Sequence, residues 1–163
     1  MMAITDERDQ DQLKLGDPAP DFTLLSHSEG ELNLAWYQGR KNVVLAFYPA
    51  DWTPVCANQI PGYQAVTERF EEYGCQILAI SVDSVPSHIA WSRSLGGIDF
   101  PLMSDFYPHG DVAKKYGVLT RKGYAERVVF LIDKQGIIRF IERVPITELP
   151  DNERLFEALA GLP

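Results

Sequence analysis

The fold of this chain is decided by one stretch, Tyr48-Pro49-Ala50-Asp51-Trp52-Thr53-Pro54-Val55-Cys56. It follows an apolar run, Val43 to Phe47, which is too short for a typical helix and is rich in residues that suit a buried strand. Pro49 ends that strand because proline has no N–H group for a sheet hydrogen bond. Thr53 is expected to be the N-cap of a helix, with Pro54 at the first helical position, where a missing N–H group costs nothing. The stretch therefore predicts a strand, a turn and a helix that carries Cys56 as its third residue.

Cys56 is predicted to be a nucleophilic thiolate. At the start of a helix, unpaired backbone N–H groups and the positive end of the helix dipole favour an anion. A thioredoxin-type site reads Trp-Cys-x-x-Cys and exchanges disulfides with two thiols, but here Thr53 stands where the first thiol would be. A lone thiolate beside a hydroxyl suits attack on a small electrophile. The competing interpretation of Cys56 is a buried structural cysteine.

Length and composition fit a single domain with a substantial core. The chain has 163 residues, of which 45% are apolar. No apolar run approaches the roughly 20 residues of a membrane span. Residues 1–12 are polar and acidic, without the apolar centre of a signal peptide. We therefore expect a flexible acidic tail over residues 1–12, one domain over residues 13–163, and a cytoplasmic protein.

The net charge of the chain is −8, and it limits the partners. No local cluster of lysine and arginine reverses this charge. Because phosphate groups attract basic surfaces, the sequence argues against nucleic acid and anionic membranes as partners.

Outside the stretch that ends at Cys56, predicted strands and helices alternate. The strands are expected at residues 22–25, 31–34, 76–82, 100–103, 127–133 and 137–144. The helices are expected to follow Cys56, to start at Asp83 or Ser84, to run from Pro108 to Tyr116, and to start at Asp151. A short turn of helix is expected at residues 35–39. This order predicts an α/β fold: a thioredoxin-like sandwich with a central mixed sheet flanked by helices and an N-terminal hairpin.

The helix after Cys56 contains an irregularity at Pro61-Gly62. A proline inside a helix removes one hydrogen bond and costs about 3 kcal/mol. One interpretation is a kink required by packing. The other is that the first turns can separate from the rest, so that residues 54–60 unwind after oxidation and expose Cys56 to a second thiol.

Several segments resemble the peroxiredoxin family (AhpC/TSA-like). Pro49-x-x-x-Thr53-x-x-Cys56 is similar to the Pro-x-x-x-Thr/Ser-x-x-Cys signature of that family. The resemblance extends from Gly16 onward and includes the segments Gly16–Phe22, Phe100–Asp105, Val129–Asp133 and Gly136–Arg139. The segment Asp105–Gly110 is most similar to the AhpE-type one-cysteine peroxiredoxins.

The resemblance implies a site and a reaction. Arg127 matches the arginine that peroxiredoxins place beside the sulfur, although an arginine at a strand edge taken alone is more often a surface ion pair. Thr53, the first-turn amides including Val55, and Arg127 would grip the two peroxide oxygens while Cys56 attacks one of them and becomes a sulfenic acid. Pro49 would pack over that product.

Three neighbouring side chains are expected to support the site. Gln59 is expected to bond Thr53 or the site arginine, or else to be a solvated helix residue. Trp52 is expected to wall the site, or only to pack. Asp51 is expected to face solvent, because an inward carboxylate would hinder ionisation of the thiol.

Cys75 is expected to be buried and structural. Helical residues rise about 1.5 Å each, which separates the two sulfurs by roughly 25 Å. A disulfide needs Cα atoms within about 7 Å, so an internal Cys56–Cys75 bond would require unfolding. The resolving thiol is therefore expected from outside: a thioredoxin- or glutaredoxin-like protein or a low-molecular-weight thiol.

No metal site or cofactor is expected. His27, His88 and His109 are widely spaced and lack the spacing of metal ligands. The sequence contains no phosphate-binding glycine motif.

The sequence thus predicts a thiol peroxidase that reduces hydrogen peroxide or organic hydroperoxides. The alternatives are a thiol–disulfide oxidoreductase of the same fold and a binding module without activity. The family commonly dimerises, so a homodimer is expected, with Trp52, Trp91 and Tyr107 as possible contact residues.

Overall fold

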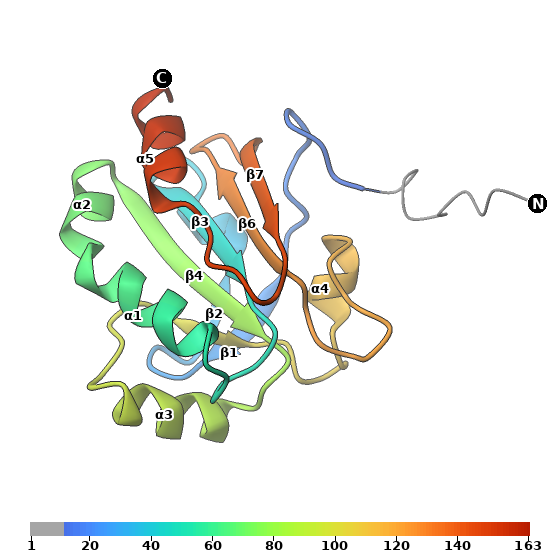
Figure 1. Cartoon of the computed structure of the whole chain (residues 1–163). Coiled ribbons are helices and arrows are strands. Elements are labelled where there is room, and N and C mark those ends of the chain that lie inside the picture. Colours follow the sequence, from blue (N-terminus) through green and yellow to red (C-terminus); the bar gives the residue numbers. More distant parts are fainter. Residues whose placement is uncertain (1–11) are drawn as a thin grey trace, which may run out of the picture.

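A computed structural model describes residues 12–163, so all of the predicted tail except Gln12 lies outside the described residues. Its centre is a seven-stranded sheet (Figure 1). The strands are β1 (Thr23–Ser26), β2 (Glu31–Asn33), β3 (Asn42–Phe47), β4 (Cys75–Ser81), β5 (Leu102–Ser104), β6 (Arg127–Ile132) and β7 (Ile138–Val144). The helices are η2 (Leu34–Tyr37), α1 (Cys56–Ala65), α2 (Thr67–Glu72), α3 (Val85–Ser94), α4 (Asp111–Lys115) and α5 (Asn152–Ala160).

The sheet is mixed, as predicted. Its strand order is β2-β1-β5-β4-β3-β6-β7. The central strand β3 pairs in parallel with β4 and antiparallel with β6. β1 and β2 form the expected N-terminal hairpin, and β1 joins the sheet through β5. The predicted α/β sandwich with a central mixed sheet is confirmed.

Two apolar cores lie on opposite faces of the sheet because successive strand residues point to opposite sides. Val43 and Phe47 of β3 belong to the core that η2 and α4 cover. Val44 and Tyr48 belong to the core under α1, α2, α3 and α5. Figure 1 shows α1, α2 and α3 beside one face and α4 on the other side of the sheet. Cys56 therefore packs into the more helix-rich face.

The helix expected after Cys56 is divided into two helices at a position that the sequence analysis did not predict. Pro61 lies inside α1, and the helix continues through it to Ala65. The interruption falls at Val66, whose φ of −118° and ψ of 22° are not helical and separate α1 from α2. Ile60 and Phe70 are still buried against the sheet, so both pieces use the predicted apolar face.

Three other helices begin close to their predicted positions. The Ser84 side chain accepts a hydrogen bond from the Ser87 N–H group and caps α3. The Asp151 side chain accepts from two N–H groups and caps α5. α4 is shorter than the predicted Pro108–Tyr116 helix, because the left-handed Gly110 immediately precedes it. Among residues 12–163, no helix is long and apolar enough to cross a membrane.

Candidate active site

The site begins where β3 ends and the chain turns toward α1. Pro49 is buried at this turn. The Thr53 carbonyl accepts a hydrogen bond from the Ala57 N–H group (2.9 Å), which starts the helical pattern. The Thr53 hydroxyl does not cap the helix as predicted, because it donates to the Ala50 carbonyl (2.8 Å). Cys56 is the first residue of α1, not the third.

The Cys56 sulfur has a guanidinium as its neighbour. The Cys56 side chain is 0% exposed. Arg127 is also buried, and its Nη1 donates to Cys56 Sγ (3.3 Å) and to Gln59 Oε1. Its Nη2 donates to the Ile146 carbonyl (2.8 Å). The guanidinium therefore places a positive charge at hydrogen-bonding distance from the sulfur. The structure thus places Arg127 beside the sulfur, as the sequence analysis expected, and Gln59 bonds to that arginine, which is one of the alternatives given for it.

Several hydrogen-bond donors in the site have no partner. Arg127 Nε is buried and bonds to no other group of residues 12–163. The backbone N–H groups of Val55 and Cys56 lie at the start of α1, where the first N–H groups of a helix have no acceptor within that helix. Buried donors are rarely left unpaired without a functional reason. These N–H groups are available to the oxygens of a bound molecule.

The comparisons with known proteins agree on one protein family. The family model described as "AhpC/TSA family" matches residues 15–141. Alkyl hydroperoxide reductase E of Mycobacterium tuberculosis is 40% identical over 151 residues, 92% of this chain and 98% of that protein. Peroxiredoxin-2 of Cricetulus griseus is 39% identical, over 89% of this chain and 75% of that protein. The chain belongs to the AhpC/TSA family of peroxiredoxins.

Solved structures agree with this assignment. The reduced 2-Cys peroxiredoxin of Plasmodium vivax superposes with a TM-score of 0.83 at 29% identity, covering 91% of this chain and 81% of that one. Mycobacterium tuberculosis AhpC gives a TM-score of 0.82 at 25% identity, covering 91% and 92%. The fold is thioredoxin-like, and the protein is a thiol-dependent peroxidase.

Asp51 of this peroxiredoxin does not face solvent, so that prediction was wrong. Its side chain is 0% exposed. The carboxylate accepts hydrogen bonds from the Tyr48 hydroxyl (2.7 Å) and the Ser87 hydroxyl (2.9 Å), and it lies 2.7 Å from His88 Nδ1. These polar partners, Tyr48 directly after β3 and two residues of α3, draw the carboxylate inward. The spacing of the sequence carried no signal for this cluster, because its members meet only in the folded chain.

Trp52 and Trp91 differ in exposure. The Trp52 side chain is 58% exposed, and its indole Nε1 donates to Ser87 Oγ (3.3 Å). Trp91 is 1% exposed and stacks on Tyr48 with ring centroids 5.7 Å apart. Trp91 therefore cannot be a dimer contact, which corrects the sequence-based expectation for this residue. Tyr107, 87% exposed, is accessible.

Cys75 is buried, as predicted, and lies far from Cys56. It is the first residue of β4 and pairs with Asn42 at the start of β3, whereas Cys56 follows the end of β3. Six strand residues span roughly 20 Å. Burial raises the pKa of the Cys75 thiol to about 12. The two thiols are not bridged.

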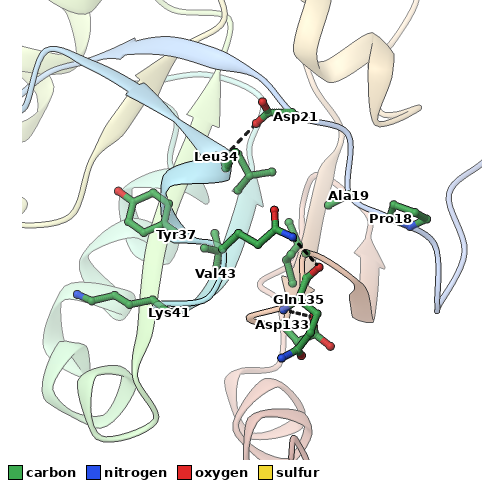
Figure 2. A pocket seen from close by; sticks show the side chains of 13 residues that line it. Pro18, Ala19, Asp21, Leu34, Tyr37, Lys41, Val43, Asp133 and Gln135 are labelled. Carbon is green, nitrogen blue, oxygen red and sulfur yellow. Dashed lines mark hydrogen bonds between the residues drawn. The ribbon is translucent and has the colours of Figure 1, made fainter.

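A cavity of about 160 Å³ lies at the opposite end of the sheet from Cys56. Figure 2 shows it between the side chains of Tyr37, Lys41 and Val43 and the turn of Asp133 and Gln135. It is smaller than the roughly 300 Å³ of typical ligand pockets. Among the residues described, no group of three or more His, Cys, Asp or Glu side chains is arranged to hold a metal.

Proposed function

We propose that Cys56 is the thiol that reduces the peroxide. The substrates are hydrogen peroxide and organic hydroperoxides, the product on the protein is a Cys56 sulfenic acid, and an external thiol recycles it. The observation that carries the proposal is the 3.3 Å hydrogen bond from Arg127 Nη1 to Cys56 Sγ in a site closed to solvent. A buried cation at the sulfur supplies the charge that a thiolate nucleophile needs.

The reaction is an in-line displacement on the peroxide. The Cys56 thiolate attacks the terminal oxygen of ROOH, an S–O bond forms, and the O–O bond breaks. The product is Cys56–SOH, and the leaving RO⁻ takes up a proton to give ROH. The sulfur is oxidised by two electrons and the peroxide is reduced by two.

The unpaired donors of the site stabilise the charge that moves to the oxygens. Arg127 Nε and the N–H groups of Val55 and Cys56 donate toward them. Thr53 takes the complementary role: its own proton goes to the Ala50 carbonyl, so its oxygen accepts from the O–H group of the peroxide. Pro49 excludes water from the sulfenic product.

Recycling requires a thiol from outside the chain. An external thiol R′SH attacks the sulfenic acid, releases water and forms a mixed disulfide, and a second thiol releases Cys56. Cys75 is a poor resolving group because it is buried at the other end of the strand. We assign the reductant to the class of low-molecular-weight thiols or thioredoxin- or glutaredoxin-like proteins.

A thiol–disulfide oxidoreductase is the second candidate function. The hydroxyl of Thr53 occupies the place of the first thiol and is hydrogen-bonded to the backbone, which argues against disulfide exchange. Reduction of insulin in the presence of dithiothreitol separates the two functions, because only the oxidoreductase accelerates it.

We also propose a homodimer that functions in the cytoplasm. Trp52, Phe106 and Tyr107 are exposed aromatic side chains, which are common at interfaces between proteins. Two unbridged cysteines fit a reducing compartment.

The decisive experiment is titration with one equivalent of hydrogen peroxide. We expect a change in tryptophan fluorescence and a sulfenic acid that a dimedone-type reagent traps at Cys56. The Cys75→Ser variant is the matched control and should behave as the wild type. Failure to trap the sulfenic acid in the wild type, or trapping that survives Cys56→Ser, would refute the assignment.

A further inference from the structure

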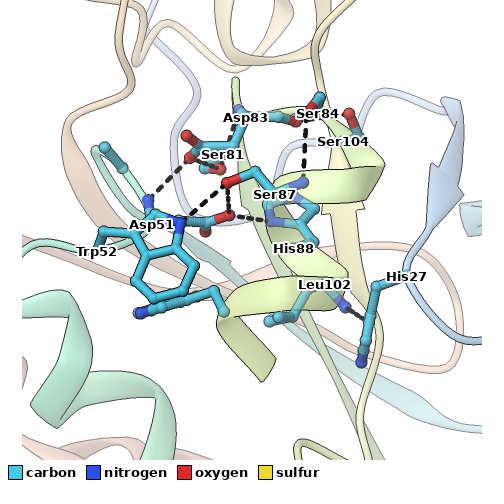
Figure 3. A network of polar contacts seen from close by, with 12 residues as sticks. His27, Asp51, Trp52, Ser81, Asp83, Ser84, Ser87, His88, Leu102 and Ser104 are labelled. Atoms are coloured by element: carbon cyan, nitrogen blue, oxygen red, sulfur yellow. Dashed lines mark hydrogen bonds and ion pairs between the residues drawn. The ribbon is translucent and has the colours of Figure 1, made fainter. Parts of the chain in front are cut away.

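A buried polar network lies directly before the Cys56 turn. Figure 3 shows the side chains of Asp51, Ser87 and His88 pointing toward one another, with Asp83 beside them. Asp51 Oδ1 accepts from the Tyr48 hydroxyl, and Asp51 Oδ2 accepts from the Ser87 hydroxyl and contacts His88 Nδ1. The carboxylate therefore has three partners in a place with almost no water, which fixes its position.

His88 connects this network to the sheet. Its side chain is 0% exposed, and its Nε2 donates to the Met103 carbonyl of β5 (3.0 Å) because a carbonyl can only accept. Its Nδ1 faces Asp51 at 2.7 Å. The turn before Cys56 is thus linked through one imidazole to α3 and to β5.

The peptide group between Ala50 and Asp51 transmits this anchoring to Thr53. The N–H group of that peptide donates to Asp83 Oδ2 (2.9 Å). Its carbonyl accepts the Thr53 hydroxyl (2.8 Å). The N–H group and the carbonyl of one peptide are held in a single rigid plane. The contacts of the Asp51 side chain and the Asp83 carboxylate fix the position of this peptide. Together they therefore determine where the Thr53 oxygen points.

Trp52 provides independent evidence that the turn is held under constraint. Its φ of 67° lies in the left-handed region, which is strained for a large side chain. The residue is held from both sides, by the anchored Asp51 and by the bond from its indole to Ser87. Such a conformation persists only where the surroundings enforce it.

We propose that Asp51, held by His88, is a positioning residue of the peroxidase reaction. It fixes the peptide that orients the Thr53 hydroxyl, and it acts on the peroxide through Thr53 without touching the substrate. The inference rests on the proposed role of Cys56 and adds a residue to it.

A double-mutant cycle tests this proposal. Asp51→Asn keeps the shape of the side chain but weakens its bonds to His88 and Ser87, and Thr53→Val removes the hydroxyl. In the wild-type background, Asp51→Asn should lower the second-order rate constant with hydrogen peroxide about tenfold. In the Thr53→Val background the same change should lower it less than about twofold, because the group through which Asp51 acts is already absent.

Alkylation of Cys56 by iodoacetamide is the second readout. That reaction needs the thiolate but not an oriented Thr53 hydroxyl, so Asp51→Asn should change its rate by less than about threefold. A loss of folded protein would abolish the peroxide reaction and expose the buried Cys56 to iodoacetamide, so the folded fraction of each variant is measured by circular dichroism. The matched control is Asp133→Asn, which alters another buried carboxylate at the far end of the sheet and should leave the peroxide rate constant within about twofold.

If Asp51→Asn fails to fold, Ser87→Ala can replace it in the same double-mutant cycle. It removes one bond to Asp51 and the acceptor for the Trp52 indole, and should lower the peroxide rate constant about threefold, again only when Thr53 is present. Equal effects in both Thr53 backgrounds, or an unchanged peroxide rate constant, would overturn the proposal. Failure to trap a sulfenic acid at Cys56 in the wild type would instead overturn the proposed role of Cys56 as the peroxide-reducing thiol.

Discussion

At the scale of the residue, Arg127 contacts three acceptors with one planar side chain. These are the sulfur of Cys56, the amide oxygen of Gln59 and the carbonyl of Ile146. A lysine would keep the positive charge but, as a single ammonium group, could not reproduce this fork. The reactivity of the site with peroxide is therefore expected to depend on the geometry of the guanidinium as well as on its charge.

We expect Arg127→Lys to lower the second-order rate constant with hydrogen peroxide about 100-fold, the usual cost of losing an oriented donor. Stopped-flow tryptophan fluorescence gives this constant. The control is Arg139→Lys, which alters a partly exposed arginine paired with Asp133 and should have no effect on the rate. A loss of less than threefold in Arg127→Lys would show that charge alone is sufficient.

Cys75 should be inert while the protein is folded. Burial raises its pKa to about 12, so at pH 8 only about one molecule in 10⁴ carries the thiolate there. We expect iodoacetamide to leave Cys75 unlabelled in folded Cys56→Ser protein and to label it promptly in concentrated urea, as measured by mass spectrometry. Prompt labelling of the folded variant would contradict the buried position.

The sequence predicted part of the site at this scale. The signature around Cys56 and the match at Arg127 named two side chains that the structure brings into contact, and helical spacing brought Gln59 within reach of Arg127. Asp51 was predicted to face the wrong way, because its partners Ser87 and His88 lie more than thirty residues away and the pairing depends on the packing of α3. The Ile146 carbonyl could not be predicted, since every residue has one.

At the scale of the element, the starts of helices were easier to predict than their interruptions. Ser84 and Asp151 cap α3 and α5 as their side-chain chemistry suggests. Pro61 was expected to kink the helix or to let its first turns separate, and the helix continues through it, whereas the break at Val66 was not predicted. Tertiary packing of Ile60 and Phe70 on the sheet decides this point and is not a property of the local sequence.

His27 should make the part of the sheet where β1 pairs with β5 sensitive to acid. Its Nδ1 accepts the Leu102 N–H group (3.0 Å), and its Nε2 contacts the Ile98 carbonyl (3.2 Å), an arrangement that requires the neutral ring. Burial, partly offset by the bond to Ile98, lowers the pKa of His27 below its usual value of about 6.5. The unfolded chain therefore takes up the proton more readily than the folded one.

The stability that His27 contributes is accordingly complete above pH 6.5 and is lost as the pH falls from there toward the lower pKa of the folded state. We expect the urea midpoint of the wild type to fall between pH 7.5 and pH 5.5, and the midpoint of His27→Gln to fall less. Equal decreases in the two proteins would show that other groups cause the acid sensitivity.

At the scale of the whole molecule, the fold was predicted correctly because its pattern is redundant. The central strands β3, β4 and β6 are mostly apolar, and Pro49, Gly74 and Gly136 mark turns next to them. The order β-α-β followed by a terminal hairpin leaves few topologies. The assembly of subunits was less predictable, since exposure of an aromatic residue is known only after folding, as Trp91 shows.

The proposed dimer leads to a prediction about Tyr107. A charge at an exposed aromatic contact is costly to bury, so Tyr107→Glu should weaken self-association about tenfold or more, measured by sedimentation equilibrium. Trp36→Glu, at another exposed aromatic residue on η2, is the control and should leave the equilibrium unchanged. A dimer that persists in Tyr107→Glu would place the interface elsewhere.

The complete burial of the Cys56 sulfur has a consequence for the kinetics of the catalytic cycle. A peroxide group is small enough to enter such a site, whereas a bulky reductant must wait until the chain around the sulfur opens. In the reductive half of the cycle, the chain around the sulfur first opens in a unimolecular step, and the reductant then reacts with the exposed sulfenic acid. Turnover should consequently reach a plateau as the reductant concentration increases, and the height of that plateau should be the same for chemically different thiols.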